Sequence, residues 1–232
     1  MTDTPTLLLV GASRGLGLAI AEEFAKRGWS VVGTVRGEGR TALHELAERY
    51  PGRIEIERLD VTDAGQISAL RERLDGRRFD ILFVNAGVAS SDRDETAGSA
   101  ETDEFVRLMV TNALAPMRVI ERLDNLVEPD GLIGIMSSGL GSVANNETGG
   151  FDVYRGTKAA VNTYMRSYAA RRNATDRALL LLAPGWIRTE MGGADAPFGI
   201  EETIPDIVGT IIAKRERPGL EYLDRFGGTV PW

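Results

Sequence analysis

Short runs of apolar residues alternate with longer helical patterns along the whole chain. The apolar runs, each of which predicts a β-strand, lie at residues 6–10, 30–35, 53–59, 79–85, 131–137 and 177–183. Apolar residues recur at helical spacing, and so predict helices, at residues 15–28, 40–50, 63–74, 102–126 and 154–173. Strands that are apolar almost throughout, in alternation with helices, are typical of a parallel sheet covered on both faces.

This alternation is continuous, which bears on domain organisation. No linker, low-complexity stretch or longer repeat interrupts it, so we predict one domain over residues 1–232. We expect an α/β, doubly wound parallel sheet (a Rossmann fold) of about seven strands with helices on both faces. In such a sheet ligands bind beyond the carboxyl ends of the strands, where the strand order reverses. The polar stretch at 90–104 is expected to be a surface loop.

Composition and charge narrow the class of protein. Of the 232 residues, 43% are hydrophobic and 26% are charged, as in ordinary globular proteins. The 27 Lys and Arg against 34 Asp and Glu give a formal net charge of −7, which argues against nucleic acid or an anionic membrane as a partner. With no signal peptide and no run of eighteen apolar residues in the sequence, we expect a cytoplasmic protein.

Two residue types exclude several chemistries. The chain has no cysteine, which excludes disulfides, thiolate catalysis and cysteine-ligated metals, and we predict no metal site. The single histidine, His44, is the only possible base for a Ser-His-Asp hydrolase. It lies in a polar helical pattern, and we interpret it as a solvated structural residue.

A glycine-rich turn follows the first predicted strand and leads into a helix. The sequence GASRGLG places Gly11, Gly15 and Gly17 at Gly-x-x-x-Gly-x-Gly spacing, which is neither the Gly-x-Gly-x-x-Gly form nor a P-loop. Glycines in this context allow a tight turn and let backbone N–H groups approach a pyrophosphate. The alternative is a turn that only permits close packing, and the strand–turn–helix context favours phosphate binding.

The end of the second predicted strand bears on the choice of cofactor. NAD-binding sites usually present a carboxylate there for the ribose 2′-hydroxyl, whereas this chain has Val35 followed by Arg36. Arg36 can bind a 2′-phosphate through a charge-assisted contact, and Arg14 can add a second positive charge. Both arginines could instead be solvated loop residues. The charges favour NADP(H) over NAD(H).

Pro116 lies inside the helical pattern at 102–126. Proline has no N–H, so the hydrogen bond to the carbonyl of Asn112 is lost. We expect a kink there that leaves this carbonyl free to hold a water molecule. A tolerated kink without function is the alternative.

A serine, a tyrosine and a lysine suggest proton transfer. Ser137 and Ser138 follow the fifth predicted strand, and Tyr154 and Lys158 lie one helical turn apart in the next helix. An ammonium close to a phenol favours the phenolate, so we expect Lys158 to lower the pKa of Tyr154 and make it an acid or base toward a carbonyl or alcohol. Ser138 would bind the substrate oxygen. The alternative is a packed ring beside a surface lysine.

Seven motifs in order carry a resemblance to the short-chain dehydrogenase/reductase family. They are GASRGLG (11–17), LDVTD (59–63), NAG (85–87), NALAP (112–116), SS (137–138), YRGTK (154–158) and PGWIRT (184–189). The insertion SVANNETGGF after the serines, with TEMGG at 189–193, is similar to a subgroup related to the C-factor protein and sniffer-type carbonyl reductases. The insertion lengthens the distance between serine and tyrosine beyond the commonest in the family, which keeps Ser137 as a rival of Ser138.

The resemblance implies roles for individual residues. It implies a catalytic set of Asn112, Ser138, Tyr154 and Lys158, in which the carbonyl of Asn112 holds the relay water and Lys158 also holds the nicotinamide ribose. The cofactor contacts that we expect are Gly11, Ser13, Arg14, Gly15, Leu16, Gly17, Arg36, Asp60, Val61, Asn85, Ala86, Gly87, Tyr154, Lys158, Pro184, Gly185, Ile187 and Thr189. Among them, Asp60 and Val61 would lie against the adenine.

The resemblance therefore predicts an NADP(H)-dependent oxidoreductase of EC 1.1.1 type that acts on a small carbonyl or alcohol substrate. The alternative is a nucleotide-binding signalling or regulatory protein of the same fold with little turnover. Residues 186–204 are expected to cover the substrate, with Met191, Phe198 and Ile200 as apolar contacts or as packing residues. The resemblance also implies a homodimer or homotetramer built on the helices at 102–126 and 154–173.

Overall fold

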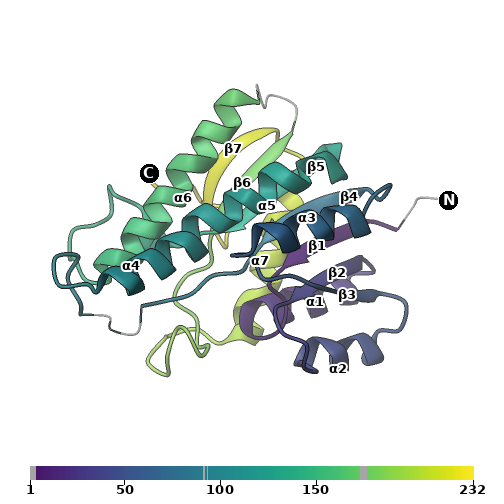
Figure 1. Cartoon of the computed structure of the whole chain (residues 1–232), viewed down its shortest axis with the longest axis horizontal. Helices are drawn as coiled ribbons and strands as arrows, with labels where there is room; N and C mark the ends of the chain where they lie inside the picture. The colour runs from purple at the N-terminus through teal and green to yellow at the C-terminus, as the bar shows by residue number, and fades with distance from the viewer. Residues whose placement is uncertain (1–3, 91, 93, 173–176) are drawn as a thin grey trace.

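One parallel sheet forms the centre of the molecule. The computed structural model describes residues 4–90, 92, 94–172 and 177–232 (Figure 1). Its seven strands run in the order β3-β2-β1-β4-β5-β6-β7, and every neighbouring pair is parallel. The strands are β1 Thr6–Val10, β2 Ser30–Val35, β3 Ile54–Arg58, β4 Phe79–Val84, β5 Val127–Met136, β6 Ala178–Ala183 and β7 Gly219–Asp224. The predicted doubly wound sheet is confirmed.

Helices cover both faces of this sheet. The α-helices are α1 Gly15–Lys26, α2 Ala42–Arg49, α3 Ala64–Arg73, α4 Thr102–Met109, α5 Ala115–Leu123, α6 Asp152–Arg171 and α7 Ile200–Arg215. Figure 1 shows α1, α2 and α7 on one side of the sheet and α3, α5 and α6 on the other.

The apolar strands explain why both faces are covered. In β1, the side chains of Leu8 and Val10 enter the core beneath α3, α5 and α6, while Leu7 and Leu9 enter the core beneath α1 and α7. All four are fully buried. Because side chains alternate between the two faces of a strand, a strand that is buried on both faces must be apolar throughout. The pattern that predicted the strands is therefore the pattern that packs them.

The strand order indicates where a ligand is expected to bind. The chain runs from β1 outward through β2 to β3 and then crosses back to β4 on the other side of β1. The carboxyl ends of β1 and β4 are therefore neighbours at the point where the order reverses, the position at which open α/β sheets bind ligands. The loops that follow these two strands carry the glycine turn and the NAG motif.

The helical segment at 102–126 differs from the single kinked helix that we expected. Between α4 and α5 the chain forms a π-helical turn, η1 Val110–Leu114, in which the amide of Ala115 donates to the carbonyl of Val110. Pro116 then lies in the first turn of α5, where the absence of its N–H costs little. The irregularity that proline demands is a widened turn that contains Asn112, and π turns of this kind are frequent at functional sites.

The boundaries of other segments also differ from those that the sequence predicts. The pattern at 154–173 begins earlier, at Asp152, and its last residue, Asn173, lies outside the described residues. The described part of the stretch at 90–104 is loop as far as Glu101, and Ser91 and Arg93 lie outside the described residues. Residues 200–204 of the expected substrate-covering segment belong to α7, a helix that the sequence pattern did not identify.

Candidate active site

The predicted site residues lie at one edge of the sheet, beyond the carboxyl ends of the strands or in the helices that follow them. The glycine turn follows β1, Arg36 follows β2, Asp60 and Val61 follow β3, and Asn85, Ala86 and Gly87 follow β4. Asn112 lies in η1, Ser138 follows β5, and Tyr154 and Lys158 lie in α6. Pro184, Gly185, Ile187 and Thr189 follow β6.

Close contact between the glycine turn and the end of β4 explains two of the glycines. A Cβ on Gly11, whose φ is +90°, would lie 2.8 Å from the backbone of Ala86. A Cβ on Gly17 would lie 2.0 Å from the carbonyl oxygen of Gly11. The side-chain amide of Asn85 donates to that same carbonyl at 2.8 Å. Asn85 therefore fixes the glycine turn to the neighbouring strand end.

The first turn of α1 fits a phosphate group. The helix begins at Gly15, where φ is +57° and an added Cβ would meet no atom within 4 Å. Arg14 precedes it without a side-chain cap, and the first turn carries no acidic residue. The first N–H groups of a helix lack partners within the helix, and together with its dipole they favour an anion. This turn has both the donors and the open space that a pyrophosphate needs.

Two arginines and an aspartate lie near the expected adenosine end. Arg36 is exposed beyond β2, and within the described residues it takes part in no ion pair. The guanidinium of Arg14 pairs with Glu190, and both side chains are largely exposed. The carboxylate of Asp60 accepts from the backbone and the hydroxyl of Thr62, at 2.9 and 2.7 Å. Of these charges, that of Arg36 is the most available to a 2′-phosphate.

Asn112 joins two sides of the site. Its side chain is buried, accepts from the amide of Val88 at 2.8 Å and donates to the carbonyl of Val88 at 2.8 Å. It also donates to the hydroxyl of Thr157 at 3.1 Å. The sequence reasoning missed Thr157, although it stands directly before the catalytic lysine candidate. These bonds fix the loop after β4 against α6.

Lys158 is buried beside the same loop. Its Nζ donates to the carbonyl of Met136 at 2.9 Å and lies 5.6 Å from the centre of the Tyr154 ring. A Cβ added to Gly87 would lie 3.6 Å from this Nζ and 3.3 Å from Oδ1 of Asn112. Burial lowers the pKa of Lys158 to about 8. The structure thus brings Gly87, Asn112, Tyr154 and Lys158 together.

The pKa of Tyr154 differs in direction from our expectation. Burial raises it to about 12, and a hydrogen bond with the Ser138 side chain, which lowers it, only partly offsets this. The neighbouring Tyr222 raises it further. Lys158 lies over the face of the ring and donates to a backbone carbonyl, so its charge does not offset the effect of burial on the phenol. In this structure the phenol is neutral at physiological pH.

The two serines after β5 have different surroundings. The hydroxyl of Ser137 is buried and donates to Oδ1 of Asn162 at 2.7 Å. The side chain of Ser138 is half-buried, hydrogen-bonds Tyr154 and accepts from the amide of Leu140 at 3.2 Å. The geometry favours Ser138 as the partner of the tyrosine.

The segment after β6 combines packing and exposed residues. The side chain of Ile187 is buried in the core, so only its backbone is available to a ligand. The hydroxyl of Thr189 accepts from the amide of Gly192 at 2.9 Å. Phe198 packs under the guanidinium of Arg225, and Ile200 packs against the core, so neither fits the role of a substrate contact.

Two large apolar residues of this segment remain accessible. Met191 is 45% exposed, and Trp186, which the sequence reasoning did not single out, is 49% exposed. The indole N–H of Trp186 donates to the carbonyl of Gly192 at 2.8 Å. This bond holds the ring against the loop that carries Met191.

Among the described residues there is neither a group of metal ligands nor a membrane-spanning helix. In the part of the chain that the structure describes, no three His, Cys, Asp or Glu residues are grouped in a way that could hold a metal ion. The described helices include none with the length and apolar character needed to span a membrane.

Comparisons with known proteins identify relatives of this chain. A family model described as enoyl-(acyl carrier protein) reductase matches residues 11–216. A structure described as a short-chain dehydrogenase/reductase from Burkholderia multivorans with bound NADP is 61% identical, with a TM-score of 0.97, over 99% of this chain and 100% of that one. A carbonyl reductase from Pseudomonas aeruginosa PAO1 in complex with NADP is 33% identical, with a TM-score of 0.90, over 99% of this chain and 100% of that one.

The chain is also similar to the C-signal protein of Myxococcus xanthus. The two are 31% identical over 155 residues, which cover 66% of this chain and 92% of that protein.

Proposed function

The chain belongs to the short-chain dehydrogenase/reductase family of oxidoreductases, and on that premise we propose that it interconverts a small carbonyl compound and its alcohol with NADP(H), using Tyr154 as general acid and base. One observation carries this proposal. The Tyr154 phenol, hydrogen-bonded to Ser138 and beside the buried Lys158, lies at the edge of the sheet where the glycine turn offers a phosphate site. A protein that only binds a nucleotide has no need of this arrangement.

The residues present fit NADP(H). The first turn of α1 would hold the pyrophosphate, Arg36 would hold the 2′-phosphate, and Asp60 and Val61 would lie against the adenine. Lys158 would hold the nicotinamide ribose, and the backbone of residues 184–189 would hold the nicotinamide. When bound, the nicotinamide supplies or accepts the hydride at the substrate carbon. The NADP in the structure from Burkholderia multivorans supports this choice of cofactor.

The proton is handled by the protein. With a pKa near 12, Tyr154 carries its proton at neutral pH and can donate it to the oxygen of a carbonyl that is being reduced. Ser138 would bind the same oxygen. The positive charge of Lys158 would stabilise the negative charge that develops on the phenol as the proton leaves. In the opposite reaction the ionised phenol would accept the proton of the alcohol.

Asn112 has a supporting role in this proposal. Its side chain is fully used in holding the loop after β4 to α6. Its backbone carbonyl would hold the water through which Tyr154 regains a proton. Trp186 and Met191, both exposed in residues 186–204, would contact the substrate.

The proposal is tested by following NADPH oxidation with butanal, benzaldehyde and menadione. We expect turnover of at least one compound by the wild type and a loss of about 10³-fold with Tyr154→Phe, the size expected for removal of a general acid. Equal rates in the two proteins would contradict the role of Tyr154. NADPH binding measured by fluorescence separates loss of chemistry from loss of the cofactor.

A signalling or regulatory protein of the same fold is the second candidate, and the similarity to the C-signal protein favours keeping it. It predicts tight NADPH binding with no turnover of any compound in the panel. That result would contradict the enzyme proposal and support the signalling or regulatory protein.

The 2′-phosphate contact has its own test. Arg36→Asp should weaken NADPH binding by about 10²-fold and NADH binding by less than threefold, since a charge-assisted contact becomes a repulsion. Fluorescence titration with both nucleotides measures this. An equal loss of affinity for both nucleotides would contradict a contact between Arg36 and the 2′-phosphate.

We also propose a homodimer or homotetramer. Phe105, Val106 and Leu114, on the segment from α4 to η1, and Tyr164 of α6 are large apolar residues with 40–49% of their surface exposed. Light scattering after gel filtration gives the assembled mass, and a monomeric mass would contradict this proposal.

A further inference from the structure

Tyr222 lies behind the catalytic serine. It belongs to β7, and only 1% of its surface is exposed. Its hydroxyl donates to the backbone carbonyl of Ser138. The side chains of Ser137 and Asn162 also lie against this hydroxyl. All these contacts of the phenol therefore lie on the turn that carries Ser138 or on the helix that carries Tyr154 and Lys158.

That turn is held closely against α6. Asn162 accepts from the hydroxyl of Ser137 at 2.7 Å and donates to the carbonyl of Gly141 at 3.3 Å. A Cβ on Gly141 would lie 2.9 Å from the Cβ of Lys158 and 3.0 Å from Nδ2 of Asn162. Because no room remains between the turn and the helix, a shift of one moves the other.

The ring of Tyr222 is supported in turn by Trp232. The ring of Trp232 lies 5.5 Å from it, and Arg166 lies 4.5 Å over the ring of Trp232. The carbonyl of Trp232 accepts from the amide of Ala144 at 3.0 Å, in the loop that follows the serines. These contacts hold Tyr222 in one orientation.

We propose that Tyr222 is a positioning residue, which holds the backbone of Ser138 so that the Ser138 hydroxyl stays aligned with the phenol of Tyr154. Ser138 is held from both sides, because its side chain is hydrogen-bonded to Tyr154 and its backbone carbonyl accepts a hydrogen bond from Tyr222. Small displacements of a catalytic group cost rate, so the hydroxyl of Tyr222 accelerates the reaction through Ser138. This inference rests on the proposed function.

The test is Tyr222→Phe in two backgrounds, wild type and Ser138→Ala, with NADPH and the compound of the panel that is reduced fastest. In the wild type, kcat should fall about tenfold, the factor that one hydrogen bond is worth, with NADPH affinity unchanged. In Ser138→Ala the same change should lower kcat less than twofold, because two residues that act through one contact are not additive. An equal fall in both backgrounds, or no fall in the wild type, would overturn the proposal.

Tyr168→Phe is the matched control. Tyr168 is equally buried, 2% exposed, and its hydroxyl donates to Asp124 at 2.9 Å. Its loss should lower the melting temperature and leave kcat unchanged. If Tyr222→Phe does not fold, Trp232→Phe, which loosens the ring but keeps the hydroxyl, should give a smaller fall in kcat that is again absent in Ser138→Ala.

The two proposals fail in distinguishable ways. Wild-type rates in Tyr154→Phe would end the proposed function. An inactive Tyr154→Phe with a fully active Tyr222→Phe would end only the role of Tyr222.

Discussion

Two tyrosine–cation pairs with the same spacing lie on or directly after one helix. In α6, Lys158 follows Tyr154 by four residues, and Arg172, the residue directly after α6, follows Tyr168 by four residues. The cation lies 5.6 Å from the centre of the tyrosine ring in both pairs. We assign chemistry to the first pair and a structural role to the second, so spacing and distance do not decide function.

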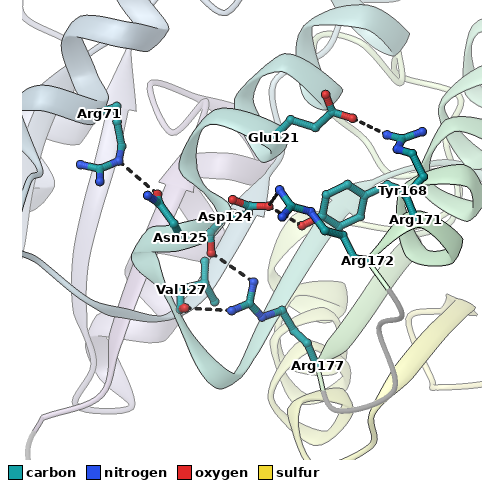
Figure 2. A network of polar contacts seen from close by, with 9 residues as sticks. All are labelled: Arg71, Glu121, Asp124, Asn125, Val127, Tyr168, Arg171, Arg172 and Arg177. Carbon is teal, nitrogen blue, oxygen red and sulfur yellow. Dashed lines mark hydrogen bonds and ion pairs between the residues drawn. The ribbon is translucent and has the colours of Figure 1, made fainter.

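The partners of each phenol make the difference. Figure 2 shows the second pair gathered around Asp124, whose carboxylate accepts from the hydroxyl of Tyr168 at 2.9 Å and pairs with Arg172. Arg177 donates to the backbone carbonyls of Asp124 and Val127, at 3.1 and 3.0 Å. Burial and this carboxylate raise the pKa of Tyr168, so its proton is held in the network.

Among the described residues, the phenol of the first pair has no such carboxylate beside it. Tyr154 is hydrogen-bonded to a neutral hydroxyl that lowers its pKa, and Lys158 donates to a neutral carbonyl. Its position also differs, because Tyr154 lies near the first turn of α6, at the carboxyl edge of the sheet, and Tyr168 lies near the other end of the helix. We therefore expect the first pair to transfer a proton, because its phenol has a neutral partner and lies at the carboxyl edge of the sheet.

Removal of each cation should produce the largest difference between the pairs. Lys158→Met should lower kcat/KM by about 10²-fold, because the charge that stabilises the developing phenolate is lost. Arg172→Met should leave kcat/KM within twofold, since Arg172 contacts Asp124 and the ring of Tyr168, which we place outside the reaction. Steady-state NADPH oxidation measures both, and equal losses would erase the distinction.

The pH dependence of stability should follow Lys158. Its pKa is lowered from 10.5 to about 8, so between pH 8 and 10.5 the unfolded chain binds a proton that the folded chain does not. The free energy of unfolding of the wild type should therefore rise with pH through this window relative to Lys158→Met, by up to about 3 kcal/mol. Urea unfolding at several pH values measures this difference, and parallel curves would contradict it.

The smallest effect should come from Tyr168. Tyr168→Phe should lower the free energy of unfolding by about 1–2 kcal/mol, because the buried carboxylate of Asp124 loses one donor and keeps Arg172. Urea unfolding at pH 7 measures the loss. Unchanged stability would mean that Tyr168 contributes nothing to this network.

The sequence predicted the sheet well and some details poorly, for physical reasons. Strands buried on both faces carry an uninterrupted apolar signal, which is why β1 and β2 begin and end as predicted. β7 was not located, because GLEYLD mixes polar and apolar residues in an edge strand that is only partly buried.

The sequence likewise predicted some features of the site and missed others. The motifs identified the residues at the carboxyl edge, since they lie close to one another along the chain or at fixed places after strands. The raised pKa of Tyr154 was missed, because it depends on burial that helical spacing cannot report. Tyr222 was missed because its contact, the carbonyl of Ser138, lies 84 residues away in the sequence.

The most direct test compares the two tyrosines of α6 in one assay. Single-turnover NADPH oxidation would be followed in Tyr154→Phe and Tyr168→Phe, with each protein saturated with NADPH and the same carbonyl compound. The account predicts a loss of about 10³-fold for Tyr154→Phe and a rate within twofold of the wild type for Tyr168→Phe. Rates that fall together, or a Tyr154→Phe protein that reacts like the wild type, would contradict it.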